Sequence, residues 1–167
     1  GHCISVDPWF FVEAAPDLAD LIYAARLVND SQPRFALKLI ERGLGSLKGR
    51  RVAALGLAFK PDVDDLRESP AAEVVHLLQE AGAQVKAFEP FRPEGLPGIP
   101  CVASLEEAVR DAECVVLLVH HAPFIALDPA ELSRLTPARL VIDMRNVWSP
   151  AAWEAAGFTL LRLGVGK

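Results

Sequence analysis

The sequence lacks the features that mark membrane proteins, secreted proteins and nucleic-acid binders. No apolar run approaches the roughly 18 residues that span a bilayer. Aspartate and glutamate outnumber lysine and arginine by 22 to 17, so the formal net charge is −5 and no broad positive field exists for nucleic acid or anionic lipid. The first residues also lack the basic and then apolar layout of a secretory signal. We therefore expect a cytoplasmic protein that binds neither nucleic acid nor membrane.

Cysteine is scarce, and its spacing excludes the common zinc sites. The three cysteines form no C-x-x-C pair and no Cys/His zinc spacing, so no metal site is predicted and the thiols are expected to be reduced. Cys114 lies in an apolar run typical of a buried strand, and Cys101 follows Pro100 at the start of a short strand. Only Cys3 lies in polar surroundings where a thiol would be exposed.

Two further absences concern a nucleotide-binding motif and an initiator methionine. The sequence contains no G-x-G-x-x-G fingerprint, which argues against a free-standing dinucleotide-binding domain. The single methionine is Met144, and none stands at the start. We interpret the chain as a fragment or an excised domain of a longer protein.

What the sequence does contain is a regular alternation of strand and helix patterns. Residues 1–16 look irregular, whereas residues 17–48 have apolar side chains at helical spacing, with a break expected near Pro33 and an end at Gly43 or Gly45. From residue 49 to 167, continuous apolar strands alternate with capped amphipathic helices. The pattern predicts an α/β fold, in which a Rossmann-like parallel sheet flanked by helices follows a long connecting helix.

Polar residues gather after two of the predicted strands, at the sheet edge where α/β proteins bind ligands. GLAFKPDVDDLRESP contains Lys60 and Arg67, a point charge and a planar fork that both suit phosphate. The alternative is that both pair with the carboxylates of the same loop. Arg145, in DMRNVW, has the same ambiguity. The neighbours His120 and His121 are expected to pack at a helix start, because adjacent side chains point in different directions.

Four stretches in this order, GHCISVDPWF, ARLVND, GLAFKPDVDDLRESP and VIDMRNVW, resemble the UDP-glucose/GDP-mannose dehydrogenase family of nucleotide-sugar 6-dehydrogenases. The resemblance extends over nearly the whole chain. It divides the chain into a catalytic-cysteine loop at 1–16, a central dimerisation helix at 17–48 and a UDP-sugar-binding domain at 49–167. Val6 stands where the UDP-glucose branch has lysine, which favours the N-acetylhexosamine branch.

The resemblance implies a two-step, NAD-dependent oxidation of a primary alcohol to a carboxylate. It assigns Cys3 as the nucleophile that holds the intermediate as a thiohemiacetal and then a thioester, Asp7 to the hydrolytic water, and His2 to shaping the loop. The substrate that it implies is UDP-N-acetyl-D-mannosamine, which would be converted to the uronate. UDP-N-acetylglucosamine is the alternative substrate, and a non-catalytic nucleotide-sugar-binding module is the alternative function.

The resemblance also assigns the binding residues. Lys60 and Arg145 would contact the UDP-sugar, Phe59 would line the uridine pocket, and Arg67 would reach the cofactor between domains. Arg26, on the connecting helix, would lie beside the substrate, at a dimer interface or in ordinary helix packing. A homodimer is expected. The NAD-binding domain of the family is absent from these 167 residues, so we expect the chain alone to be inactive.

Overall fold

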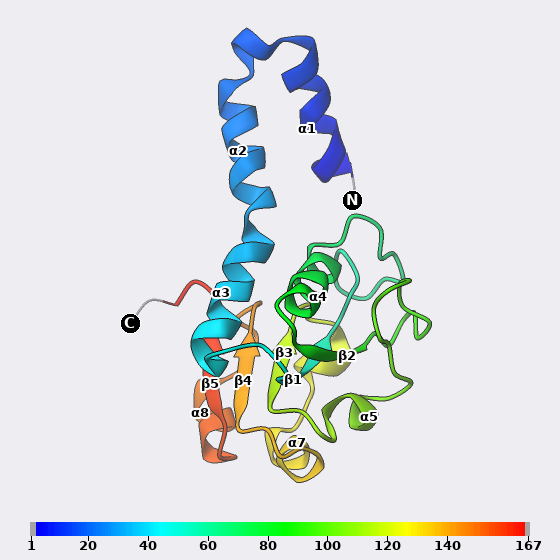
Figure 1. Ribbon diagram of the computed structural model, residues 1–167, viewed down its shortest axis with the longest axis vertical. Helices are drawn as coiled ribbons and strands as arrows, with labels where there is room; N and C mark the ends of the chain where they lie inside the picture. The colour runs from blue at the N-terminus through cyan, green and yellow to red at the C-terminus, as the bar shows by residue number, and fades with distance from the viewer. Residues whose placement is uncertain (1–2, 166–167) are drawn as a thin grey trace.

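The computed structural model describes residues 3–165, and Figure 1 shows N-terminal helices that project from an α/β domain. The predicted role of His2 lies outside the described residues. The projecting elements are α1 (Cys3–Ala14), the 3-10 turn η1 (Pro16–Leu18) and α2 (Asp20–Asp30), whereas the next helix, α3 (Gln32–Leu44), packs on the α/β domain. α1 folds back along α2, and the Trp9 and Tyr23 rings meet edge to face at 5.9 Å between centroids.

The expected irregular loop at the start of the chain is a helix instead. Pro8 suggested a break in the sequence, but α1 continues through it. Proline lacks an N–H, so the carbonyl of Ile4, four residues earlier, receives no helical hydrogen bond. Arg26 of α2 replaces that bond, because its Nη1 donates to the Ile4 carbonyl at 3.0 Å. A contact from a distant residue therefore accommodates the proline.

The connecting helix is divided near the predicted break. α2 ends at Asp30 and α3 begins at Gln32, with Pro33 in the first turn of α3, where a missing N–H costs nothing. α3 ends at Leu44 and is capped by Gly45, whose φ of 75° suits glycine. The apolar side chains Leu21 and Val28 on α2 are 83% and 63% exposed, so the predicted apolar stripe is uncovered in this chain.

The predicted sheet is confirmed: five parallel strands are hydrogen-bonded in the order β2-β1-β3-β4-β5. The strands are β1 (Arg51–Leu55), β2 (Gln84–Phe88), β3 (Cys114–Leu117), β4 (Leu140–Asp143) and β5 (Thr159–Arg162). Since β2 and β3 flank β1, their connections leave on opposite sides, and a crevice opens beyond the carboxyl ends of β1 and β3. β1 ends at Leu55 because Gly56, with φ of 88°, leaves the strand conformation.

Helices cover both faces of the sheet, and serine side chains cap the starts of two of them. They are α4 (Pro70–Glu80), α5 (Leu105–Val109), α6 (Ala122–Ile125), α7 (Pro129–Leu135) and α8 (Pro150–Ala155). Ser69 Oγ accepts the Ala71 N–H at the start of α4, and Ser104 Oγ accepts the Glu107 N–H at the start of α5.

Alternate strand residues separate two buried cores. One core packs against α3 and α4, and the other packs against α5, α7 and α8. Cys114 is fully buried in the first core, as its apolar surroundings predicted. None of the helices between residues 3 and 165 is long and apolar enough to cross a bilayer.

Candidate functional site

A cleft at the carboxyl edge of the sheet brings together three of the predicted site residues. Phe59 and Lys60 follow β1, Arg145 follows β4, and all three line this cleft, which has a volume of about 120 Å³. Its remaining wall is largely apolar and comes from α3, α4 and the segments after β3 and β5; it includes Pro33, Ala36, Val74, Val119, Met144 and Leu163. We call it the carboxyl-edge cleft.

Lys60 is free to meet a ligand. Its side chain is exposed, and no carboxylate lies within ion-pair distance of it among residues 3–165. The ammonium group lies 5.3 Å from the centroid of the Phe59 ring, which keeps cation and aromatic ring together at the cleft. The alternative in which Lys60 pairs with carboxylates of its own loop is therefore not what the structure contains.

The turn after β4 is built on Asp143. This fully buried carboxylate accepts the Arg145 N–H through Oδ1, and the Val147 and Trp148 N–H groups through Oδ2, each at 2.8 Å. Asn146 takes a φ of 57° at the centre of the turn. Three bonds to one buried side chain thus fix where the Arg145 backbone leaves the sheet.

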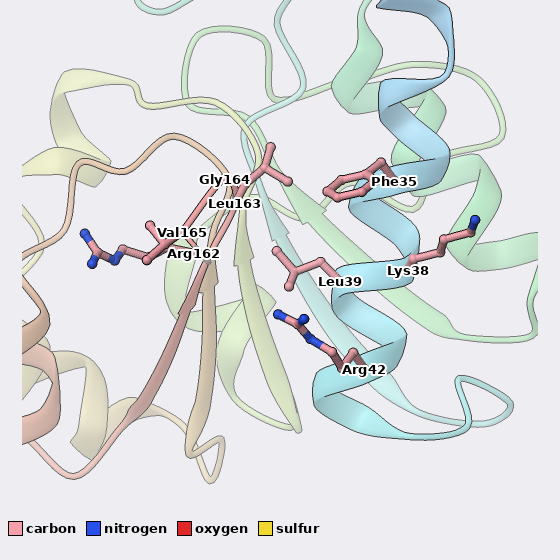
Figure 2. Close-up of a pocket in the computed structure, with 8 residues that line it drawn as sticks. All are labelled: Phe35, Lys38, Leu39, Arg42, Arg162, Leu163, Gly164 and Val165. Atoms are coloured by element: carbon pink, nitrogen blue, oxygen red, sulfur yellow. The ribbon is translucent and has the colours of Figure 1, made fainter. Parts of the chain in front are cut away.

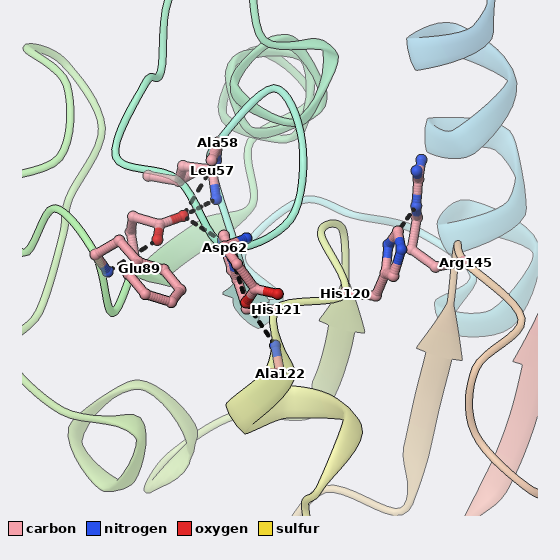
Figure 3. Close-up of polar contacts among 9 residues, drawn as sticks. Leu57, Ala58, Asp62, Glu89, His120, His121, Ala122 and Arg145 are labelled. Atoms are coloured by element: carbon pink, nitrogen blue, oxygen red, sulfur yellow. Dashed lines mark hydrogen bonds and ion pairs between the residues drawn. The ribbon is translucent and has the colours of Figure 1, made fainter.

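The side chain of Arg145 is directed by a histidine. Arg145 Nε donates to His120 Nδ1 at 3.1 Å, as Figure 3 shows. Partial burial, and then the neighbouring Arg145 charge, lower the pKa of His120. A neutral imidazole can accept the guanidinium N–H. His120 therefore orients the Arg145 side chain through Nε without adding a charge, and the Nη groups remain available to an anion.

Arg67 lies elsewhere. Its guanidinium pairs with Asp65, with Nε and Nη2 donating at 2.9 and 2.7 Å, so the carboxylate alternative from the sequence is realised here. The residue is exposed and lines a separate, larger cleft of about 550 Å³ between the N-terminal helices and α4. Trp9 and Arg26 line the same cleft.

Cys3 and Asp7 form a second group on α1. Their four-residue spacing puts them on one face of the helix, where they border a shallow depression together with Pro8, Phe11 and Ile22. Cys3 is exposed in the first turn. The thiol and this carboxylate are therefore brought together, but they do not line the carboxyl-edge cleft within this chain.

Sequence reasoning gave Arg26 no definite role, although it is among the few buried charges. It is 7% exposed, and besides the Ile4 carbonyl it contacts Asn29 Oδ1 at 3.3 Å and the Asp30 carboxylate. Its Nε is buried without a partner among the described residues. The sequence feature that could have indicated a role for Arg26 is the proline in α1, because it leaves one backbone carbonyl without a helical hydrogen-bond donor.

A further cleft separates α3 from β5 and has a volume of about 430 Å³. Figure 2 shows Phe35 and Leu39 on α3 facing Leu163, while Lys38 and Arg162 point away from the space between them. Arg42 is the one lining cation whose side chain extends from α3 toward this space in Figure 2, so the three cations do not converge, and no residue predicted for the site lines this cleft.

Comparison with known proteins places these features in a family. The profile described as UDP-glucose/GDP-mannose dehydrogenase family, UDP binding domain, matches residues 53–150. The NDP-N-acetyl-D-galactosaminuronic acid dehydrogenase of Ralstonia nicotianae is 43% identical over 153 residues, covering 89% of this chain and 35% of the relative. The UDP-N-acetyl-D-mannosamine dehydrogenase of Methanocaldococcus jannaschii is 36% identical over 174 residues, covering 100% and 39%.

A solved structure agrees with this relationship. The UDP-D-ManNAc dehydrogenase from Pyrococcus horikoshii superposes with a TM-score of 0.82 at 27% identity, over 98% of this chain and 38% of that protein. The chain thus spans a little more than a third of the length of its relatives. Because the family profile covers more than half of the 167 residues, the chain belongs to the UDP-glucose/GDP-mannose dehydrogenase family and contains its UDP-binding domain.

Proposed function

We propose that this chain is the substrate-binding part of an NAD-dependent nucleotide-sugar 6-dehydrogenase, and that the carboxyl-edge cleft binds the UDP portion of the substrate. The observation that carries the proposal is the convergence of Phe59, Lys60 and Arg145 from two distant segments on one cleft. An unpaired ammonium group and a guanidinium fork suit a diphosphate. The Phe59 ring and the apolar wall suit a pyrimidine base.

Cys3 and Asp7 would perform the chemistry on the sugar. In our proposal the C6 alcohol loses a hydride and a proton to become an aldehyde, and the Cys3 thiolate adds to its carbon to give a thiohemiacetal. The thiohemiacetal then loses a second hydride together with its hydroxyl proton, which gives a thioester. A water molecule oriented by Asp7 then attacks the thioester carbonyl, which releases the carboxylate and restores the Cys3 thiol. NAD would accept the hydride in each oxidation.

The residues of this chain offer little to hold NAD themselves. They include no G-x-G-x-x-G fingerprint, so we assign cofactor binding to a domain outside these 167 residues. Arg67, exposed at the 550 Å³ cleft, is proposed to reach the cofactor from this side. We therefore expect no NADH formation when the chain alone is mixed with NAD and any UDP-sugar. A measurable rise in NADH absorbance at about 340 nm would contradict the assignment of cofactor binding to another domain.

For the substrate we propose UDP-N-acetyl-D-mannosamine, with UDP-N-acetylglucosamine as the alternative. The relatives are named for N-acetylated hexosamines or hexosaminuronic acids of different configuration, which supports the N-acetylhexosamine class more strongly than one sugar. Steady-state rates of the full-length protein with UDP-N-acetylmannosamine, UDP-N-acetylglucosamine, UDP-N-acetylgalactosamine and UDP-glucose would decide between them. A preference for UDP-glucose would refute the class.

We also propose that the protein is a homodimer. The exposed apolar side chains of α1, η1 and α2, among them Phe11, Leu18 and Leu21, give a face of the kind that subunit interfaces cover. Light scattering of the full-length protein should give twice the monomer mass. Leu21→Glu should shift the mass toward the monomer, and a monomeric wild-type protein would contradict the proposal.

Calorimetric titration of this chain with UDP, UMP and GDP tests the cleft. We expect UDP to bind more tightly than UMP, because the second phosphate meets the Lys60 and Arg145 charges. Lys60→Ala and Arg145→Ala should each weaken UDP binding about tenfold. Lys48→Ala is the control, since Lys48 is exposed next to the amino end of β1, at the opposite edge of the sheet. UDP binding that is equal in all variants would place the ligand elsewhere.

A further inference from the structure

Two titratable side chains are fully buried where β2 and β3 end. Glu89 follows β2, His121 follows β3, and both have no exposed surface. The Glu89 carboxylate and the His121 imidazole form the hydrogen-bond network that Figure 3 shows. Burying a carboxylate is costly unless hydrogen bonds compensate for its lost hydration. The network therefore indicates which backbone groups these two side chains hold.

Glu89 holds the segment just after β1. Its Oε2 accepts the N–H groups of Leu57 and Ala58 at 2.7 and 3.1 Å and the ring N–H of His121 at 3.0 Å. Its Oε1 accepts the Phe91 N–H at 3.1 Å. These bonds outweigh the effect of burial, and they lower the pKa of Glu89 below its ordinary value. The two residues before Phe59 are thus fixed by one carboxylate.

His121 holds the far side of the same loop. Its Nδ1 lies 2.8 Å from the Asp62 backbone nitrogen and accepts that N–H, so the ring proton resides on Nε2 and is donated to Glu89. Asp62 has a φ of 59°, and its Oδ1 accepts the Ala122 N–H at 2.8 Å. Two hydrogen bonds, one to the His121 ring and one to the Asp62 side chain, therefore join the loop to the start of α6.

We propose that His121 and Glu89 are positioning residues, which set the conformation of the loop from Leu57 to Asp62 so that Phe59 and Lys60 line the carboxyl-edge cleft. β1 ends at Leu55, so the sheet ladder no longer supports the backbone there. The side-chain pair holds three N–H groups of this short loop, on both sides of the two binding residues. The link to ligand binding rests on the proposed function; the ordering of the loop does not.

Two histidine variants separate the two bonds of the ring. In His121→Asn, the amide oxygen replaces Nδ1 and can still accept the Asp62 N–H, whereas the donor to Glu89 is lost. In His121→Gln, the amide nitrogen replaces Nε2 and can still donate to Glu89, whereas the acceptor for Asp62 is lost. If the imidazole positions the loop, His121→Gln should bind UDP about three- to tenfold more weakly than wild type, and His121→Asn should bind it within about twofold.

Amide hydrogen exchange gives a readout that does not depend on a ligand. The Asp62 amide should exchange at least about tenfold faster in His121→Gln than in wild type or His121→Asn. Val109→Ala, which creates a cavity at α5 in the core away from the carboxyl-edge cleft, controls for lost stability and should leave both readouts unchanged. Equal exchange and equal UDP affinity in the two histidine variants would overturn the proposal. If wild type does not bind UDP, the proposed function fails, and the exchange rates still decide whether the pair orders the loop.

Discussion

Replacing Glu89 by glutamine should cost more stability than its small change in shape suggests. The carboxylate accepts four hydrogen bonds, three of them at Oε2. A glutamine has one acceptor oxygen, and its cheapest orientation keeps that oxygen at the three-donor position. The amide nitrogen then faces the Phe91 N–H, so one bond to a charged group is lost and two donors face each other. Bonds of this kind contribute about 1.5–3 kcal/mol, so Glu89→Gln should lower the free energy of unfolding by about 2–3 kcal/mol.

The same residue predicts how stability depends on pH. The folded-state pKa of Glu89 lies below its unfolded value of about 4.3. Between the two values the unfolded chain binds more protons, so stability rises with pH there. The Glu89 contribution is complete above about pH 4.3 and is lost as the pH falls through the folded-state pKa.

Urea unfolding followed at several pH values between about 3 and 7 measures both effects. Wild type should lose part of its stability on acidification, and Glu89→Gln should show a smaller loss because the titrating group is gone. A difference in unfolding free energy below about 0.5 kcal/mol at neutral pH, with parallel pH profiles, would refute the reasoning. It would mean that water or a rearranged loop satisfies the four donors.

Three further predictions concern other parts of the chain. Iodoacetamide should label exposed Cys3 faster than Cys101 or Cys114, whose thiol pKa values are raised by burial; equal labelling would contradict the exposed thiol. Arg26→Gln should destabilise the packing of α1 on α2 by about 1–3 kcal/mol and speed hydrogen exchange in α1, whereas unchanged exchange would show that the helix needs no partner. Gly56→Ala should lower the melting temperature by several degrees, since a β-carbon there would lie within 3.0 Å of three atoms of Val119. An unchanged melting temperature would show that the backbone moves to make room for the methyl group.

The sequence predicted the sheet well because its signals are local. The apolar pattern of residues 49–167 predicted the alternation of strands with capped helices, and Ser69 and Ser104 cap two of these helices. α1 was wrongly expected to be irregular because Pro8 is a local break signal. The bond from Arg26 that compensates for it is a contact between helices, which no local pattern contains.

The site was predicted in part for a similar reason. Residues after parallel strands meet at one edge, so the sequence could place Lys60 and Arg145 near each other. It could not decide between a ligand charge and a loop ion pair, and the structure gives different answers for Lys60 and Arg67. His121 was expected to pack at a helix start. Its bond to Asp62 and its partner Glu89 depend on the loop conformation, which the sequence does not reveal.

The most direct test of the account is a titration of the ¹⁵N-labelled chain with UDP, followed by amide chemical shifts. We predict saturable shifts at Phe59, Lys60 and Arg145 and at Val119 on the wall of the same cleft. Residues that line only the cleft between α3 and β5, such as Lys38 and Arg42 in Figure 2, should not respond. Shifts confined to that second cleft, or no shifts at millimolar UDP, would contradict the assignment of the carboxyl-edge cleft as the nucleotide site.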